Sequence, residues 1–281
     1  MRWMFDFARS HKSKRLAEGE QRDLYRLHDG SLFWLDGGRY LDRCLIEEGV
    51  FEPASTKWVQ RLVYPGNSVL DVGANLGYYS VLLAAQVGTA GRVTAFEPTA
   101  YYRDVLMRNL QANELAGRVH IIPYGLSSET ASFEIGFGEC SATLHWVEDQ
   151  PPVRQERIEL YALDEIWPSL GLNSLDFIKA DIDGHEPAFL QGAERTLSRY
   201  RPILLLEVNH ANYLAAGWTA WDFYEYLRGK GWRLFSESSG REYVSRMAFL
   251  RECGNFDRSA NILVATGSGA AERLERLGMT R

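Results

Sequence analysis

The sequence predicts an α/β fold built on a doubly wound, mostly parallel sheet. From residue 67 onward, short apolar runs alternate with helix-like stretches. Several of these runs are apolar without alternation, as strands covered on both faces should be. Strand, helix, strand units with right-handed crossovers build such a sheet. The predicted strands are 69–70, 93–96, 119–122, 177–178, 203–206 and 262–264.

The stretches between these strands carry helical patterns. In one of them, Phe189, Ala193 and Leu197 fall on one helical face. Pro202 then takes the residue before it out of the helical region, so this helix should end there. The predicted helices are 78–86, 101–113, 188–200 and 221–230, and a short charged helix is expected after 267–269.

One region breaks the rhythm between the third and fourth parallel strands. Residues 130–161 alternate at Phe133, Ile135 and Phe137, and again at Ile158 and Leu160. We expect an antiparallel pair with a long loop, inserted into the parallel sheet. Loops of this length in compact domains are usually lids, binding loops or disordered segments, and we expect this one to govern which ligand is accepted. The expected domains are an N-terminal extension of helices and strands over 1–66 and the α/β domain over 67–281.

Composition narrows the classes of protein and partner. The net charge of -6 gives no field to attract phosphate backbones, which argues against nucleic acid. Three scattered cysteines form no CxxC pair, which argues against zinc and disulfides and favours a reducing, cytoplasmic location. No apolar run approaches the roughly 20 residues of a membrane span.

The N-terminus carries a short apolar stripe at Trp3, Met4, Phe7 and Ala8, followed by basic residues. A helix with this pattern could lie on an anionic membrane surface. The alternative is a helix docked on its own domain or on a partner subunit of a homo-oligomer.

The strongest local pattern is VLDVGANLGYYS, in which a strand ending in Asp71 is followed by Gly73, Asn75 and Gly77. Glycines allow positive φ and let a ligand lie against the main chain. In the dinucleotide fingerprint GxGxxG the middle glycine admits a pyrophosphate, and Asn75 occupies its place here, so NAD fits poorly. Glu97 ends the next strand, where it can accept hydrogen bonds from ribose hydroxyls. The alternative is a structural turn with an exposed glutamate.

DVGANLG, FEP at 96–98, KADIDGHE and LLLEVNH together resemble the FkbM-type S-adenosylmethionine-dependent methyltransferases, and GVFEP at 49–53 looks like that family too. The resemblance runs from about Phe51 to Val264. It implies a class I methyltransferase fold, which is Rossmann-like, and O-methylation of a hydroxyl of a sugar, glycan or other small metabolite. One departure is Asp183, where the family commonly has Glu.

The same resemblance implies which residues bind S-adenosylmethionine. The methionine end of the cofactor would be lined by Asp71, Gly73, Asn75 and Gly77, and the ribose held by Glu97. The residues that would border the adenine are Gly125, Leu126 and Ser127.

The stretch KADIDGHEP follows an apolar strand and places Asp181, Asp183, His185 and Glu186 at its end. Ligands of open α/β sheets bind beyond the carboxyl ends of the strands, so this cluster should face the methyl acceptor. His185 is the first candidate for the general base, because its unperturbed pKa suits neutral pH. Asp183 could orient it, and Asp181 could contact cofactor or acceptor.

Each of these assignments has an alternative. His185 could instead cap a helix, and Glu186 is expected as a surface acid that favours the helix dipole. Asp181 and Asp183, with Asn209 or His210, could bind Mg²⁺, since hard oxygen ligands suit that ion.

Further residues are expected to contact the acceptor. The candidates at the end of the next strand and in the inserted loop are His145, Trp146, Glu207, Asn209 and His210. Rival functions are an NAD-type oxidoreductase, a non-catalytic cofactor-binding protein and an amino-group methyltransferase acting on nucleic acid. The last normally shows an Asp/Asn-Pro-Pro-aromatic stretch after the fourth strand, where this chain has 181–184 (DIDG).

Overall fold

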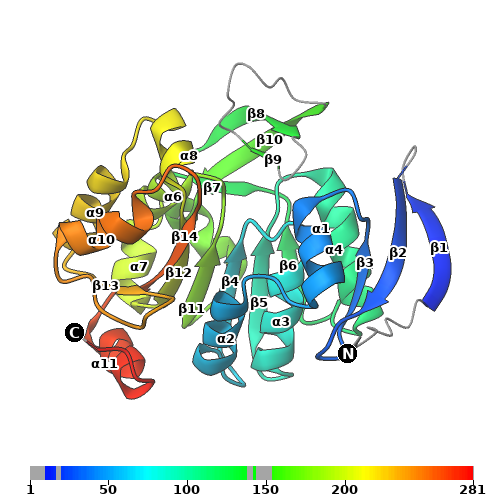
Figure 1. Cartoon of the computed structure of the whole chain (residues 1–281), viewed down its shortest axis with the longest axis horizontal. Coiled ribbons are helices and arrows are strands. Elements are labelled where there is room, and N and C mark those ends of the chain that lie inside the picture. The colour runs from blue at the N-terminus through cyan, green and yellow to red at the C-terminus, as the bar shows by residue number, and fades with distance from the viewer. Residues whose placement is uncertain (1–9, 17–19, 138–141, 144–153, 281) are drawn as a thin grey trace, which may run out of the picture.

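The computed structural model describes residues 10–16, 20–137, 142–143 and 154–280, and its centre is a seven-stranded sheet in the order β13-β14-β12-β11-β4-β5-β6 (Figure 1). Neighbours from β12 to β6 run parallel, whereas β14 runs antiparallel to both β12 and β13. The predicted mostly parallel sheet is therefore confirmed. Its strands are β4 (Ser68–Val72), β5 (Arg92–Phe96), β6 (Val119–Ile122), β11 (Phe177–Ala180), β12 (Ile203–Val208), β13 (Arg233–Ser236) and β14 (Ala260–Ala265).

Two separate hydrophobic cores cover the two faces of this sheet. Val69 of β4 enters one core and Leu70 the other, as the two-residue period of a strand requires. The first core packs against α2 (Pro53–Leu62), α3 (Tyr78–Val87), α4 (Ala100–Ala112) and α11 (Ser268–Arg276). The second packs against α6 (Glu186–Gln191), α7 (Glu194–Tyr200), α9 (Ala220–Gly229) and α10 (Arg246–Cys253). Because both faces are covered, polar groups can reach a ligand only at the strand ends.

The structure corrects one predicted helix. The helix expected over 188–200 is broken into α6 and α7 at Gly192 and Ala193. A Cβ at Gly192 would lie 1.9 Å from the main-chain oxygen of Ser127, so the chain passes against β7 (Gly125–Ser127) there. Asp164 then caps the new N-terminus, because its carboxylate accepts the Thr196 amide at 2.8 Å. These partners are distant in sequence, so the helical pattern alone could not predict the break.

Several short elements were not predicted. They are α1 (Tyr40–Glu48), α5 (Leu163–Ile166), the 3₁₀ helix η1 (Trp167–Leu170), α8 (His210–Ala215), α10 and the edge strand β13. Most are too short to show a clear hydrophobic period. No helix in the described ranges is long and apolar enough to cross a membrane.

The inserted region forms a second sheet in the order β7-β10-β8-β9. The predicted antiparallel pair is confirmed as β8 (Ala131–Phe137) and β10 (Arg154–Ala162), and β9 (Ala142–Thr143) lies beside β8. β10 also pairs with β7 in parallel, which joins the insertion to the main body. The candidate substrate residues His145 and Trp146 lie outside the described residues.

The N-terminal extension folds into an antiparallel sheet followed by α1 and α2. Its strands are β1 (Ser10–Leu16), β2 (Glu20–Arg26) and β3 (Leu32–Leu35). The Trp34 amide donates to Asn109 Oδ1 at 2.7 Å and the Leu32 amide to Asn113 Oδ1 at 2.8 Å, so β3 is docked on α4. The apolar stripe of residues 3–8 lies outside the described residues.

A buried arginine holds this extension to the main domain. Arg22 has no exposed surface, and its guanidinium lies 2.5 Å from Asp42 of α1 and 2.6 Å from the Tyr101 hydroxyl of α4. It also donates to the main-chain oxygen of Trp34 at 3.2 Å. Burying a charge is costly unless its partners are in place, so these contacts must form together.

We expect Asp42→Ala to lower the free energy of unfolding by about 3–5 kcal/mol, because it removes the nearest carboxylate from the buried Arg22 charge and leaves only Asp36, 3.3 Å away. Urea denaturation measures this loss. The matched control is Asp104→Ala on the exposed face of α4, which should change stability by no more than about 0.5 kcal/mol. Equal stability of the two variants would contradict the prediction.

Candidate functional site

The turn between β4 and α3 is shaped by residues with positive φ. Gly73, Asn75 and Gly77 have φ of 83°, 51° and 92°. The amides of Gly73 and Ala74 both donate to the main-chain oxygen of Phe96 at 3.0 Å, which holds the turn against the end of β5. The turn therefore presents main chain, with little side-chain bulk, to the space beyond the strands.

Asp71, near the end of β4, stabilises this turn by a buried hydrogen bond to α3. It is 1% exposed, and Ser80 Oγ of α3 donates to its carboxylate at 2.6 Å. Burial raises the pKa of Asp71 to about 6. Asp71 does not line the cavities described below, although the resemblance implied a place for it at the cofactor.

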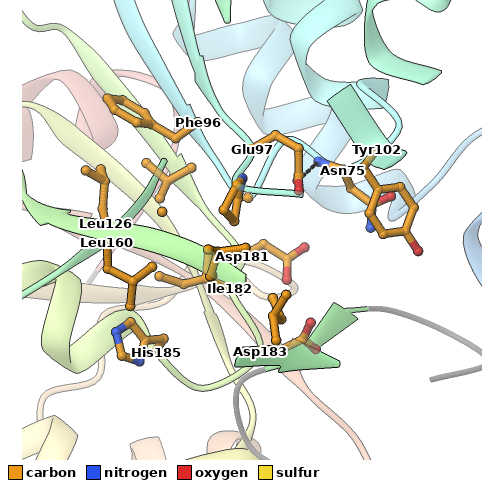
Figure 2. Close-up of a pocket in the computed structure, with 16 residues that line it drawn as sticks. Asn75, Phe96, Glu97, Tyr102, Leu126, Leu160, Asp181, Ile182, Asp183 and His185 are labelled. Carbon is orange, nitrogen blue, oxygen red and sulfur yellow. Dashed lines mark hydrogen bonds between the residues drawn. The ribbon is translucent and has the colours of Figure 1, made fainter. Parts of the chain in front are cut away.

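Glu97 joins the turn to the end of β5. The Asn75 amide donates to Glu97 Oε2 at 2.8 Å (Figure 2), and the Thr99 amide and hydroxyl donate to Oε1 at 2.9 and 2.7 Å. Burial raises the pKa of Glu97. The three donors oppose that shift and hold the carboxylate in place, and Glu97 lines the first cavity described below.

A close main-chain contact brings the turn to the KADIDGHEP stretch. A Cβ at Gly73 would lie 2.0 Å from the main-chain oxygen of Asp181, so only glycine fits this position. The Asp181 amide donates to the main-chain oxygen of Val72 at 3.1 Å. Asp183 and Gly184 then turn back sharply with φ of 52° and 96°. The expected convergence of the turn and the acidic stretch is therefore observed.

A cavity with an empty volume of about 610 Å³, including the part open to solvent, lies at this junction; we name it the first cavity. Small-molecule sites fall in this size range. Predicted residues that line it are Gly73, Asn75, Glu97, Gly125, Leu126, Asp181, Asp183 and His185 (Figure 2). Residues that the sequence reasoning missed are Pro98, Tyr102, Ile135, Ile158, Leu160 and Ile182, among others. For Ile135, Ile158 and Leu160 the only sequence signal was the alternation of apolar residues in the insertion.

A second cavity of about 920 Å³ adjoins the first, because Gly73, Asn75, Asp181 and Asp183 line both. Its other polar side chains include Tyr40, Glu52, Tyr79, Lys179 and Glu207. The N-terminal extension contributes Tyr40, Leu41, Phe51 and Glu52 to this wall, so the extension builds part of the site.

Lys179 is a buried cation beside the second cavity that the sequence reasoning did not select. Its side chain is 2% exposed, its Nζ lies 2.5 Å from Asp181 Oδ2, and it lies 4.6 Å from the centre of the Tyr79 ring. Burial opposes the charged lysine, but the charges of Asp181 and Glu52 outweigh it and raise its pKa. The sequence did contain a signal for Lys179, because a lysine in an otherwise apolar strand is unusual.

Asp181 remains accessible from both cavities. Its side chain is 26% exposed, and the pair with Lys179 fixes one of its oxygens. The other oxygen is available to a ligand.

His185 lines the first cavity only. Its Nε2 lies 2.9 Å from Ser127 Oγ. It precedes α6 without a capping hydrogen bond from its side chain. The hydrogen bond to Ser127 places the ring among the residues expected at the adenine.

The other predicted acceptor residues are dispersed. Glu207 lines the second cavity. Asn209 instead caps α8, accepting the Asn212 amide at 3.1 Å, and His210 Nδ1 accepts the Ala220 amide at 3.1 Å. Within the described ranges no three His, Cys, Asp or Glu side chains are arranged to hold a metal ion.

Glu186 differs from the expectation of a surface acid. It is fully buried, and its Oε1 accepts the Ile182 amide at 2.8 Å. It therefore braces the KADIDGHEP turn from inside. Burial raises the pKa of Glu186 to about 8.

Comparison with known proteins gives a family match over most of this region. Residues 71–255 match the model of the methyltransferase FkbM domain. The AMB antimetabolite synthetase AmbE of Pseudomonas aeruginosa is 28% identical over 50% of this chain and 8% of its own length. The methyltransferase sdnD of Sordaria araneosa is 28% identical over 45% of this chain and 60% of its own length. The chain thus spans less than two thirds of either relative.

Similar solved structures include two methyltransferases. The methyltransferase FkbM from Methylobacillus flagellatus matches 75% of this chain and 50% of its own, with 18% identity and a TM-score of 0.46. The O-methyltransferase from Bacillus cereus, in complex with SAH, matches 77% and 81%, with 16% identity and a TM-score of 0.45.

The raised pKa of Glu186 predicts a stability that depends on pH. A carboxyl whose folded pKa lies above its unfolded value stabilises the fold at low pH, and this contribution is lost as pH rises through the folded pKa. The Glu186 contribution should therefore disappear between about pH 5 and pH 8.5. Glu186→Gln keeps the acceptor for the Ile182 amide but cannot ionise. In urea titrations its free energy of unfolding should fall less with pH than that of wild type.

The control for this experiment is Glu134→Gln on the exposed surface of β8, which should follow the wild-type pH dependence. A Glu186→Gln variant that also follows wild type would show that Glu186 is not a buried titrating group.

Proposed function

The chain belongs to the FkbM methyltransferase family, and we propose that it is an S-adenosylmethionine-dependent O-methyltransferase. The proposed acceptor is a hydroxyl of a sugar, glycan or other small polar metabolite. The observation that carries this proposal is the pair of adjoining cavities, which have Gly73, Asn75, Asp181 and Asp183 in common. One cavity suits a nucleoside-bearing cofactor and the other an acceptor, and family membership argues against the NAD-type alternative.

The residues of the first cavity suit S-adenosylmethionine. Gly73 lets the turn pass directly against Asp181, and Glu97 presents a fixed carboxylate suited to two ribose hydroxyls. Gly125 and Leu126 would border the adenine, with Ser127 behind them bonded to His185. When bound, the cofactor supplies an electrophilic methyl group.

Asp181 and Asp183 are the proposed catalytic groups on the acceptor side. Both line the second cavity, and Asp181 keeps one carboxylate oxygen for a ligand while Lys179 holds the other. Such a carboxylate can accept the proton of an acceptor hydroxyl as its oxygen is methylated. Positioning by these walls would supply several kcal/mol more, up to about 7–11 in ideal cases. His185 lies with Ser127 on the cofactor side, so we propose that it contacts the cofactor.

Acceptor choice is proposed to rest on the N-terminal extension rather than on the described part of the insertion. The N-terminal extension forms one wall of the second cavity through Tyr40, Phe51 and Glu52. The described part of the insertion instead contributes Ile135, Ile158 and Leu160 to the first cavity. We retain 1–66 and 67–281 as the proposed division, with the extension as part of the working enzyme.

Glu97→Gln should weaken binding of S-adenosylmethionine and its demethylated product by about 1.5–3 kcal/mol, because hydrogen bonds to the charged carboxylate are lost or weakened. Calorimetry with the demethylated product measures the change, and Glu134→Gln is the control. Tight NAD binding with no response to either cofactor form would overturn the assignment.

Transfer of labelled methyl groups to a panel of sugars, glycosides and other polyols tests the reaction itself. Products should be alkali-stable methyl ethers; methyl esters or methylamines would contradict O-methylation of a hydroxyl.

Asp181→Asn and Asp183→Asn should lower turnover by about 10²–10⁴ if they remove the proton, while cofactor affinity stays within a few-fold. His185→Ala should instead weaken cofactor binding. If His185→Ala loses turnover and keeps cofactor affinity, the histidine is the base, as the sequence predicted. Restoration of chelator-treated enzyme by Mg²⁺ would make the aspartates metal ligands.

A further inference from the structure

A third cavity adjoins the second. Its empty volume is about 820 Å³, and it shares Glu52 and Ser259 with the second cavity. Glu237, Glu252 and Asn261 line the rest of it. The two cavities therefore form one path that leads past Glu52 towards the ends of β4 and β11.

Carboxylates dominate this path. In the second cavity the carboxylates of Glu52 and Glu207 are present besides Asp181, which is paired with Lys179. Glu237 and Glu252 add two more in the third cavity, where Arg258 is the cation among the described lining residues. An anionic acceptor, such as a phosphorylated or carboxylated molecule, would be repelled along the whole path.

Two buried oxygens on the path receive no hydrogen bond from any described residue. They are Glu207 Oε2 in the second cavity and Asn261 Oδ1 in the third. Buried acceptors normally have a donor, so each calls for a ligand that donates. This observation is independent of the excess of carboxylates. It indicates that a ligand donates a hydrogen bond at each end of the path.

Glu52 is held rigidly where the two cavities meet. It has a φ of 43°, and its carboxylate accepts the Tyr79 hydroxyl at 2.7 Å and the Asn261 amide at 2.7 Å. Non-glycine residues in this conformation concentrate at functional sites. Burial, with neighbouring negative charges, raises the pKa of Glu207 well above its ordinary value and that of Glu237 to about 7. A bound cation would relieve this repulsion.

We propose that the acceptor carries a protonated amino group, which binds in the joined second and third cavities between Glu52, Glu207 and Glu237. An ammonium group supplies both a positive charge for these carboxylates and hydrogen-bond donors for the two buried oxygens, whereas a neutral polyol supplies only donors. The proposal rests on the proposed function for one element, namely that a hydroxyl near this amine lies at Asp181 and is methylated.

Binding of spermidine tests the path without knowledge of the natural acceptor. Spermidine is a flexible chain of protonated amines, and tetraethylene glycol is a neutral chain of similar length. Calorimetry on the full chain, with and without the demethylated cofactor, should show at least tenfold tighter binding of spermidine. Glu52→Gln and Glu237→Gln should each weaken it at least fivefold, since both keep the shape and remove one charge.

Glu272→Gln on the exposed side of α11 is the control for attraction to an acidic surface and should change affinity less than twofold. No preference for spermidine over the glycol, or equal losses in all three variants, would overturn the proposal. Tight binding of Mg²⁺ that displaces spermidine would also overturn it, because the path would then be a metal site.

The same titrations separate this proposal from the proposed function. If the protein binds spermidine through Glu52 but binds neither form of the cofactor, the amine site is supported and the proposed methyltransferase function is contradicted. If the protein binds the cofactor but shows no preference for spermidine, only the proposed amine site is contradicted.

Discussion

The close approach of Gly73 to the main chain of Asp181 is the constraint on which the site depends. A Cβ at Gly73 would lie 2.0 Å from the Asp181 oxygen, so the glycine turn and the acidic stretch can meet only without a side chain there. The sheet sets up this meeting, because β4 and β11 are adjacent and parallel and both end at the same edge. Main chain from one turn and carboxylates from the next then border both cavities.

Buried titratable groups surround this junction, and burying them is costly for stability. Lys179 and Glu186 are buried within the strand and turn that carry Asp181. Apolar residues in place of a buried ion pair are often neutral or stabilising, so such groups are weak evidence of a need for stability. Lys179 and Glu186 are better explained by the way they hold the residues of the site in place. Lys179 fixes one oxygen of Asp181, and Glu186 braces the amide of Ile182, which keeps the stretch in one shape.

The sequence predicted the parts of the fold that repeat a strong pattern. Six strands of the main sheet follow from short apolar runs, and the glycine turn follows from DVGANLG. Contacts between segments that are distant in the sequence could not be predicted from these patterns. The break at Gly192 arises from the approach of Ser127, and the cap of α7 comes from Asp164.

The candidate site was predicted in the same uneven way. Gly73, Asn75 and Glu97 gather as expected, because each ends or follows a parallel strand. His185 is close in sequence to Asp183, but the turn at Gly184 sends it towards Ser127 and away from the second cavity. Glu52 belongs to a segment whose docking no strand pattern reveals, so its place beside the second cavity had to come from the structure.

The decisive experiment is a crystal structure with the demethylated cofactor bound. We expect adenine beside Gly125 and Leu126, ribose hydroxyls on Glu97, and a sulfur atom that opens onto Asp181 and the second cavity. A cofactor lying in the second cavity, or a sulfur atom walled off from Asp181, would contradict it.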